Sequence, residues 1–150
     1  MWNEKQSIRL SSICTKAVIL LAFALAVALP FLYRSDFFTT YGSIGLRITP
    51  LLLLVVYACY VPGLAALFCL NRLLTNIKNG NVFTAANVRA LRAISWACYG
   101  AAAILAAGTF ISVFFCFMAV LVAFIGLIAR VVKNVFAAAV ELKNENDLTI

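Results

Sequence analysis

The longest uncharged stretch of the sequence, residues 93–129, limits most strictly what this chain can fold into. It runs for 37 residues without a charged side chain. As one helix rising 1.5 Å per residue it would be about 55 Å long, whereas the hydrocarbon core of a bilayer is about 30 Å thick. The block is therefore expected to fold back on itself. We predict the turn between Gly108 and Phe115, because Gly108, Thr109 and Ser112 interrupt the aliphatic run.

Two earlier apolar stretches are also long enough to cross a bilayer as helices. Hydrophobic residues make up 65% of the 150 residues, and the mean hydropathy is +1.06. A soluble domain of this size has too much surface to bury so many apolar side chains. We therefore predict an all-α membrane protein that forms a single domain, with four transmembrane helices in two hairpins and the lipid bilayer as its first partner. The expected spans are residues 13–33, 49–70, 93–111 and 115–133, and the fourth helix is expected to continue past Arg130 and Lys133, whose side chains can reach the interface.

Lysine and arginine are distributed unevenly over the segments between these spans. Ten of the twelve lie in the N-terminal segment, the central loop 71–92 and the C-terminal segment. They are Lys5, Arg9, Lys16, Arg72, Lys78, Arg89, Arg92, Arg130, Lys133 and Lys143. Only Arg34 and Arg47 lie on the other side, so the positive-inside rule predicts a multi-pass protein of the cell membrane with both termini and the central loop in the cytoplasm. Charges at the edges of apolar runs also argue against direct binding of nucleic acid.

The N-terminal segment leaves one alternative open. Three cations precede an apolar run that contains Ala26-Val27-Ala28, which is similar to the cleavage site of a signal peptide. The apolar run continues through Leu32, however, and this length suits a spanning helix better.

The central loop, residues 71–92, predicts a compact helical elbow between the second and third spans. Apolar residues continue the helical spacing of the second span for about two turns beyond the membrane. These residues are Leu70, Leu73, Leu74 and Ile77. Gly80 is suited to end this helix as a C-cap, and Thr84 is suited to begin the next one as an N-cap. Phe83 is placed to pack against Val88 as a hydrophobic staple.

The C-terminal segment, residues 134–150, is expected to form a cytoplasmic tail. An amphipathic helix is predicted over residues 131–143, with one apolar face. That face holds Val132, Val135, Phe136, Ala139 and Leu142. Such a helix would lie along the membrane surface or pack on the elbow. The last six residues are three polar residues followed by an alternating apolar pair, so we expect them to fray or to add as a strand to a partner.

The sequence holds no recognisable catalytic, cofactor-binding or metal site. It contains no histidine, which is the commonest general base and metal ligand. Its carboxylates lie outside the spans, where they form no acid/base pair. The carboxylates are Glu4, Asp36, Glu141, Glu145 and Asp147. The five cysteines lack C-x-x-C spacing and are expected to pack as small apolar residues, with palmitoylation or a lone disulfide as alternatives.

Polar and small residues within the spans are interpreted as packing elements. The hydroxyl groups are expected to form hydrogen bonds between helices. They belong to Tyr57, Tyr60, Ser95, Tyr99, Thr109 and Ser112. Ala102/Ala106, Ala103/Ala107 and Ala119/Ala123 have the spacing that lets helices approach closely. Pro62-Gly63 predicts a bend in the second span.

Short pieces of the elbow and of the C-terminus resemble a known family. They are Asn76-Ile77 followed by Gly80, Val82-Phe83-Thr84, Asn87-Val88, Leu91-Arg92 and the closing Glu145-Asn146-Asp147-Leu148-Thr149-Ile150. In these pieces the chain resembles the small bacterial membrane proteins called domain of unknown function 2975. Members have four predicted helices and no established activity, and their genes often lie beside one for a Cro/CI-type helix-turn-helix regulator. The short turn between the third and fourth helices departs from this layout.

The resemblance implies a non-enzymatic membrane partner, or tether, of a cytoplasmic transcription regulator. The alternative from the residues is a small transporter or channel component, or a subunit of a larger membrane complex, in which Pro62-Gly63 and the tyrosines line a path. Assembly into a homo-oligomer stays open. The candidate residues for contact with a partner are Asn79, Gly80, Val82, Phe83, Thr84, Asn87, Glu145, Asn146, Asp147, Leu148, Thr149 and Ile150.

Overall fold

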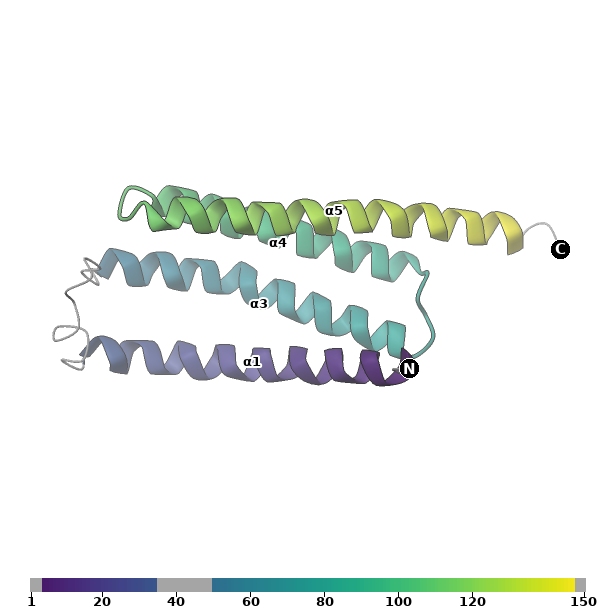
Figure 1. Ribbon diagram of the computed structural model, residues 1–150, viewed down its shortest axis with the longest axis horizontal. Helices are drawn as coiled ribbons and strands as arrows, with labels where there is room; N and C mark the ends of the chain where they lie inside the picture. The colour runs from purple at the N-terminus through teal and green to yellow at the C-terminus, as the bar shows by residue number, and fades with distance from the viewer. Residues whose placement is uncertain (1–3, 35–49, 148–150) are drawn as a thin grey trace.

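The computed structural model describes residues 4–34 and 50–147, and within these ranges all of the regular structure is helical (Figure 1). The helices are α1 (Glu4–Arg34), α3 (Pro50–Lys78), α4 (Ala85–Gly108) and α5 (Phe114–Asp147). Each is long and apolar enough to cross a membrane, which confirms the prediction of four such helices. Arg47 and the last three residues, Leu148, Thr149 and Ile150, lie outside the described residues.

The helices extend beyond the spans expected from the sequence. α3 continues to Lys78, which supplies the basic charge of its last turn, as the apolar spacing predicted. α5 is one helix of 34 residues, so the amphipathic helix predicted over residues 131–143 is a direct continuation of the fourth span. Residues 114–147 contain no proline, and their single glycine lies well inside the helix. Nothing in the sequence therefore ends α5 where the hydrocarbon core would end.

The connection between α4 and α5 lies where the sequence predicted the chain to turn. The backbone N–H groups of Ile111 and Ser112 donate to the Gly108 carbonyl at 2.9 and 3.3 Å. The Ser112 hydroxyl accepts from the Phe114 N–H at 3.4 Å and so serves the start of α5. Ser112 therefore acts locally in the turn instead of joining two helices. A β-carbon on Gly108 would lie 3.2 Å from Val55, so this end of the turn packs closely against α3.

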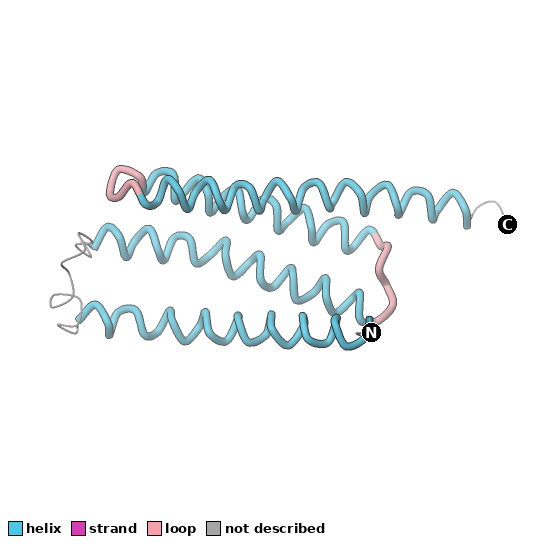
Figure 2. Tube along the Cα trace, in the orientation of Figure 1, coloured by secondary structure: helices cyan, strands magenta, loops and turns pink. Residues whose placement is uncertain are grey.

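The four helices form an open row, and not the closed bundle that four spans suggest. In the described part of the chain α1 packs against α3, α3 against α4, and α4 against α5, with the most extensive contact between the last pair. Figure 2 shows that the two described connections, residues 79–84 and 109–113, lie at opposite ends of the helices. The start of α1, the elbow and the end of α5 thus lie at one end of the molecule, which we call the elbow end (Figure 1).

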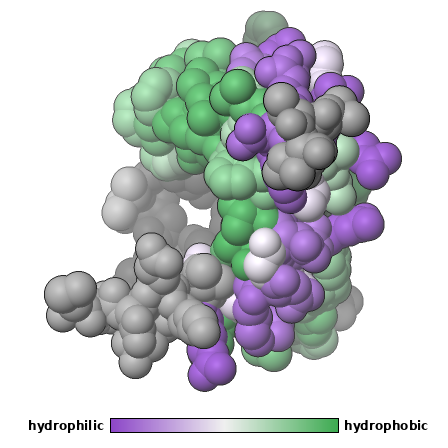
Figure 3. All heavy atoms as spheres, turned by 90° about the vertical axis from the view of Figure 1, so that its right-hand side faces the viewer, coloured by the Kyte–Doolittle hydropathy of each residue, from purple (hydrophilic) through white to green (hydrophobic). Residues whose placement is uncertain are grey.

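Most large apolar side chains of the structure are not covered by protein. The buried apolar residues are Val55, Leu73, Ala90, Leu91, Ala102, Phe115 and Ala119. Leu20 and Val61, in contrast, are 73% exposed, and Phe124 on α5 is 60% exposed. A monomer in water rarely exposes so much apolar surface, whereas a bilayer would cover it. Hydrophilic residues gather at the elbow end, onto which Figure 3 looks.

Hydrogen bonds that join neighbouring helices were predicted for six hydroxyl groups, and the structure shows them for three, those of Tyr57, Tyr60 and Ser95. The Tyr57 hydroxyl donates to the Ala26 carbonyl at 2.9 Å, and the Tyr60 hydroxyl donates to the Ala22 carbonyl. The buried Ser95 hydroxyl donates to the Gly126 carbonyl at 3.0 Å. Side-chain donors of this kind hold helices together inside a membrane, where water is absent.

The bond from Tyr57 compensates for a proline in α1. Pro30 lies inside α1 and has no N–H, so the carbonyl four residues earlier, that of Ala26, receives no helical hydrogen bond. Tyr57 supplies the missing donor from α3. Tyr60 is different, because the Ala22 carbonyl also accepts from the N–H of Ala26 within a regular helix.

We expect Tyr57→Phe to destabilise the α1–α3 pair by about 1 kcal/mol, because it leaves a carbonyl without a donor. Tyr60→Phe is the matched control and should cost less, since the Ala22 carbonyl keeps its helical donor. Thermal unfolding of both variants in the same detergent measures the difference. Equal losses of stability in the two variants would show that the hydrogen bond from Tyr57 does not stabilise the protein more because of Pro30.

Candidate functional site: the elbow

The end of α3 is fixed by a glycine C-cap. Gly80 has a φ of +81°, which is strained for any residue with a side chain. Its N–H donates to the Ile77 carbonyl at 3.0 Å, and the Asn81 N–H donates to the Asn76 carbonyl at 3.0 Å. These two bonds form a Schellman motif, which satisfies carbonyls that the helix end would leave unpaired. The predicted C-cap at Gly80 is confirmed.

The start of α4 is fixed by Thr84, and this predicted N-cap is also confirmed. Thr84 has an extended backbone, with φ −136° and ψ 149°, and its side chain accepts from the Asn87 N–H. The aromatic ring of Phe83 contacts Phe136 of α5, with 5.7 Å between the ring centroids. The predicted staple of Phe83 onto Val88 stays a prediction.

The side-chain amide of Asn87 joins the parts of the elbow. Asn87 is completely buried, with 0% of its surface exposed. Its Nδ2 donates to the carbonyls of Asn81 and Val82 at 2.8 and 2.7 Å, and its Oδ1 accepts from Asn76 Nδ2 at 2.8 Å. Both donors of the amide are used, and one side chain thereby links the end of α3, the turn and the start of α4.

A small apolar core lies under the elbow. Leu73 of α3 and Ala90 and Leu91 of α4 are buried together, and Ile77 and Phe136 pack against them. Phe136 belongs to α5, so the part of α5 beyond the expected span packs on the elbow. Of the two positions proposed for the C-terminal helix, the structure therefore has this one and not a position along the membrane surface.

The predicted contact residues of the elbow differ in exposure. Asn79, Gly80 and Phe83 are exposed, as is Asn81 between them. Val82 and Thr84 are half-buried. Asn87 is buried, so it holds the elbow in shape and does not itself reach a partner.

The predicted contact residues at the C-terminus are not brought next to those of the elbow. Glu145 and Asn146 are exposed, and Asp147 is the last residue of α5. Glu145 lies nine residues after Phe136, which corresponds to about 14 Å along the helix axis. The expectation that residues 145–147 fray or pair as a strand was wrong, because they continue α5. The elbow and the end of α5 are thus two separate surfaces.

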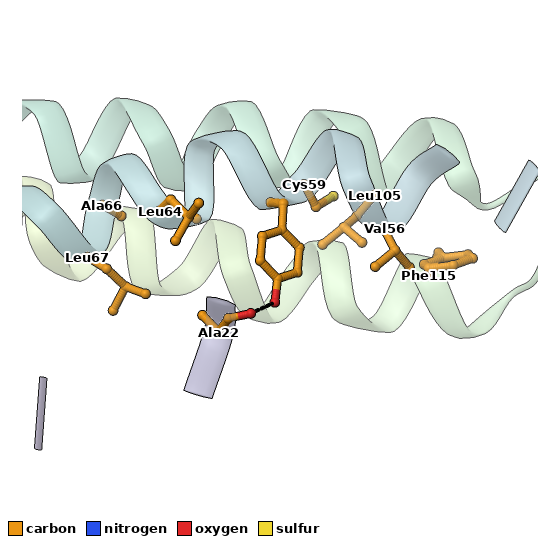
Figure 4. Close-up of a pocket in the computed structure, with 10 residues that line it drawn as sticks. Ala22, Val56, Cys59, Leu64, Ala66, Leu67, Leu105 and Phe115 are labelled. Carbon is orange, nitrogen blue, oxygen red and sulfur yellow. Dashed lines mark hydrogen bonds between the residues drawn. The ribbon is translucent and has the colours of Figure 1, made fainter. Parts of the chain in front are cut away.

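A second feature of the structure is an apolar cavity among the four helices. It has a volume of about 540 Å³ and is lined by Ala22, Val56, Cys59, Tyr60, Gly63, Leu64, Ala66, Leu67, Leu105 and Phe115 (Figure 4). The dashed line to Ala22 in Figure 4 marks the hydrogen bond that the Tyr60 hydroxyl donates to the Ala22 carbonyl. The hydroxyl of Tyr60 is therefore already engaged within the protein. A β-carbon on Gly63 would meet nothing within 4 Å. The cavity is therefore suited to apolar and not to polar contents.

Groups with the chemistry of a catalytic or metal site do not gather in the described ranges. No three histidine, cysteine, aspartate or glutamate residues within residues 4–34 and 50–147 lie close enough to hold a metal ion. All five cysteines are free thiols. The features on which a function can be built are thus the elbow, the cavity and the charged surfaces at the elbow end.

Comparison with known proteins places this chain in a class and then in a family. The fold defines an α-helical protein with four candidate membrane spans. A family model described as protein of unknown function, DUF2975, matches residues 3–150, and the chain belongs to this family. No curated protein and no solved structure matches the chain.

Proposed function

We propose that this chain is a non-enzymatic protein of the cell membrane that binds a cytoplasmic protein at its elbow, and that this partner is a helix-turn-helix transcription regulator. The observation that carries the proposal is the construction of the elbow. Two capped helix ends and a buried amide fix six residues, 79–84, in one conformation. A loop that only connects two membrane helices does not need a buried, fully engaged asparagine.

The exposed side of the elbow supports binding to a protein. It presents the polar side chains of Asn79 and Asn81 beside Phe83, whose ring is 46% exposed. Phe136 supports that ring from behind, so little conformational entropy is lost when a partner covers it. A fixed aromatic residue with polar neighbours is typical of the centre of a protein interface.

The charge distribution supports the cytoplasmic orientation. Ten of the twelve lysine and arginine residues lie in segments of the elbow end, and the positive-inside rule assigns such segments to the cytoplasm. Beyond Phe136, α5 continues for eleven residues, which corresponds to about 16 Å. Its exposed Glu141, Lys143 and Glu145 offer a second surface to the same partner.

The proposal predicts that a Cro/CI-type regulator, of the kind whose genes often lie beside those of family members, accumulates at the membrane as a fluorescent fusion only when this chain is present. We expect the variant N79E/N81E to release most of it to the cytoplasm, because two exposed side chains become charged while the carbonyl of Asn81 still holds Asn87. A tenfold weaker association corresponds to about 1.4 kcal/mol, which is typical for two contacts at the edge of an interface. Fluorescence microscopy measures the membrane fraction.

Two controls separate loss of docking from loss of the protein. Phe110→Ala changes a side chain that is 98% exposed at the opposite end, and it should leave recruitment unchanged. A chain that ends at Asn144 removes only the end of the α5 surface and should weaken recruitment in part. If the regulator stays at the membrane in a strain that lacks this chain, and its target genes are expressed unchanged there, the proposal is refuted.

A second candidate function, a component of a transporter or channel, is favoured by the apolar cavity. Of the residues that this hypothesis places along a path, Tyr60 and Gly63 line the cavity, whereas Pro62 and Tyr57 are not among its lining residues. The apolar wall restricts the cargo to hydrophobic molecules. Flux of a hydrophobic fluorescent probe through proteoliposomes tests this candidate, with Gly63→Leu, which fills the cavity, as the inactive comparison.

A further inference from the structure

Basic side chains of α4 and α5 line a crevice at the elbow end. The crevice has a volume of about 300 Å³ and is lined by Arg92, Ser95, Trp96, Arg130 and Lys133. The α4 residues lie three and four positions apart and the α5 residues three apart, so each set occupies one helix face. The hydrogen bond from Ser95 to the Gly126 carbonyl joins the two helices beside the crevice. Its walls are therefore held at a fixed separation.

The described residues that line this crevice carry positive charge and no negative charge. Three of its five lining residues are cations, and no carboxylate from the described part of the chain lines it. On α5 the nearest described carboxylate, Glu141, lies eight residues after Lys133, which corresponds to about 12 Å. Like charges held together repel each other, and an anion between them would remove that cost. Arginine in particular binds phosphate oxygens through two parallel hydrogen bonds.

The depth of the crevice in the membrane follows from the helix lengths. Arg92 lies 16 residues before the end of α4 at Gly108, and Arg130 lies 16 residues after the start of α5 at Phe114. Both are therefore about 24 Å from the turn that joins these helices, and Lys133 is about 28 Å from it. Across a hydrocarbon core of about 30 Å, these distances place the three cations at the opposite boundary, where lipid phosphates begin.

The neighbours of the crevice match the rest of a lipid molecule. Trp96 is 64% exposed and lies four residues, about 6 Å, to the membrane side of Arg92, next to the interface where tryptophan is enriched. On the membrane side of Arg130, the side chains of Leu127 and Ile128 are 53% and 49% exposed. A headgroup among the cations would thus have its acyl chains against an apolar helix face. A soluble anion would contact the cations of the crevice but not the apolar helix face beside them.

We propose that the crevice between α4 and α5 binds the phosphodiester headgroup of an anionic phospholipid. Arg92 and Arg130 bind the phosphate oxygens from the two helices, Lys133 adds a third positive charge, and Trp96 packs against the glycerol region. This site is distinct from the exposed turn of the elbow, and it does not depend on docking of a regulator.

The test uses Trp96 as the reporter. Trp2→Phe leaves Trp96 as the single tryptophan of the chain. The protein is placed in vesicles of equal parts phosphatidylglycerol and phosphatidylcholine, and either the anionic or the zwitterionic lipid carries bromine, which quenches tryptophan fluorescence on contact. We expect the brominated anionic lipid to quench more strongly, with a relative binding constant of about fivefold or more in its favour.

Matched variants separate this site from general attraction to a charged surface. R92Q/R130Q should bring the relative binding constant close to one, whereas R92K/R130K, which keeps the charges, should retain most of the preference. R72Q/R89Q removes the same charge from a different crevice, between α3 and α4, and should leave the preference intact. The proposal is overturned if both lipids quench equally in the parent protein, if R72Q/R89Q abolishes the preference as R92Q/R130Q does, or if millimolar inorganic phosphate displaces the lipid.

Discussion

Asn87→Asp is expected to destabilise the elbow by about 3 kcal/mol, the largest effect that the structure predicts for a change of so few atoms. The amide donates to the carbonyls of Asn81 and Val82 at 2.8 and 2.7 Å. A carboxylate would face these two oxygens with negative charge and no proton, in a position with 0% exposure. The carboxylate would keep the donor from Asn76, but the loss of two buried donor bonds and the burial of a charge without a cation are each costly, and here they coincide.

The measurement for this prediction is thermal unfolding in detergent, together with hydrogen exchange of the backbone amides of residues 79–84. Asn81→Asp is the matched control, because it makes the same chemical change at an exposed side chain six residues earlier, and it should be nearly neutral. Lowering the pH should return part of the lost stability to Asn87→Asp, since protonation restores one donor. If both variants unfold at the same temperature and exchange alike, the amide does not hold the elbow.

Gly126→Val is expected to loosen or separate α4 and α5, with a cost of about 3 kcal/mol. A β-carbon at Gly126 would lie 3.1 Å from the Cys98 β-carbon and 3.3 Å from a ring carbon of Tyr99. Valine adds two further methyl groups in a space that one carbon already overfills. The Ser95 hydrogen bond to the Gly126 carbonyl would be lost as the helices move apart.

Gly100→Val is the matched control for this second prediction. A β-carbon at Gly100 meets nothing within 4 Å, so the same substitution on α4 projects into open space. We expect Gly100→Val to keep the unfolding temperature close to that of the parent chain and Gly126→Val to lower it strongly. Equal unfolding temperatures for the two would contradict a close approach of α4 and α5 at Gly126.

Local signals in the sequence predicted the elements of the elbow correctly. Gly80 and Thr84 were identified as caps because few residue types serve these positions, and their preference depends on backbone conformation alone. The turn after Gly108 was predicted because a helix of 37 uncharged residues is too long for a single crossing of a bilayer. Both inferences needed no knowledge of which helices become neighbours.

Features that depend on distant parts of the chain were missed. Asn87 occupies the third position after the N-cap Thr84, where glutamate or glutamine commonly completes a capping box. This position was the one signal in the sequence that Asn87 has a structural role. Its burial, however, depends on Asn76 and on the turn folding back over it. The pairing of Pro30 with Tyr57 likewise depends on which helix lies beside α1.

The position of the C-terminal helix was left open for a similar reason. The amphipathic pattern of residues 131–143 predicted a helix, but it did not decide between a place along the membrane surface and one on the elbow. The structure continues α5 past Lys133, because Phe136 has an apolar core to pack against at Leu73 and Leu91. Helices extend beyond a membrane when tertiary packing stabilises them there, and sequence periodicity does not reveal such packing.

The most direct test of this account is the orientation of the elbow, because recruitment of a cytoplasmic regulator requires it to face the cytoplasm. In a chain whose five cysteines are replaced by alanine, single cysteines are introduced by Asn79→Cys in the elbow and Ser43→Cys in the segment between α1 and α3. Intact cells are then treated with a maleimide that does not cross the membrane. The account predicts labelling of Ser43→Cys alone, with Asn79→Cys labelled only after the cells are opened. Labelling of Asn79→Cys on intact cells would place the elbow outside and contradict the proposed function.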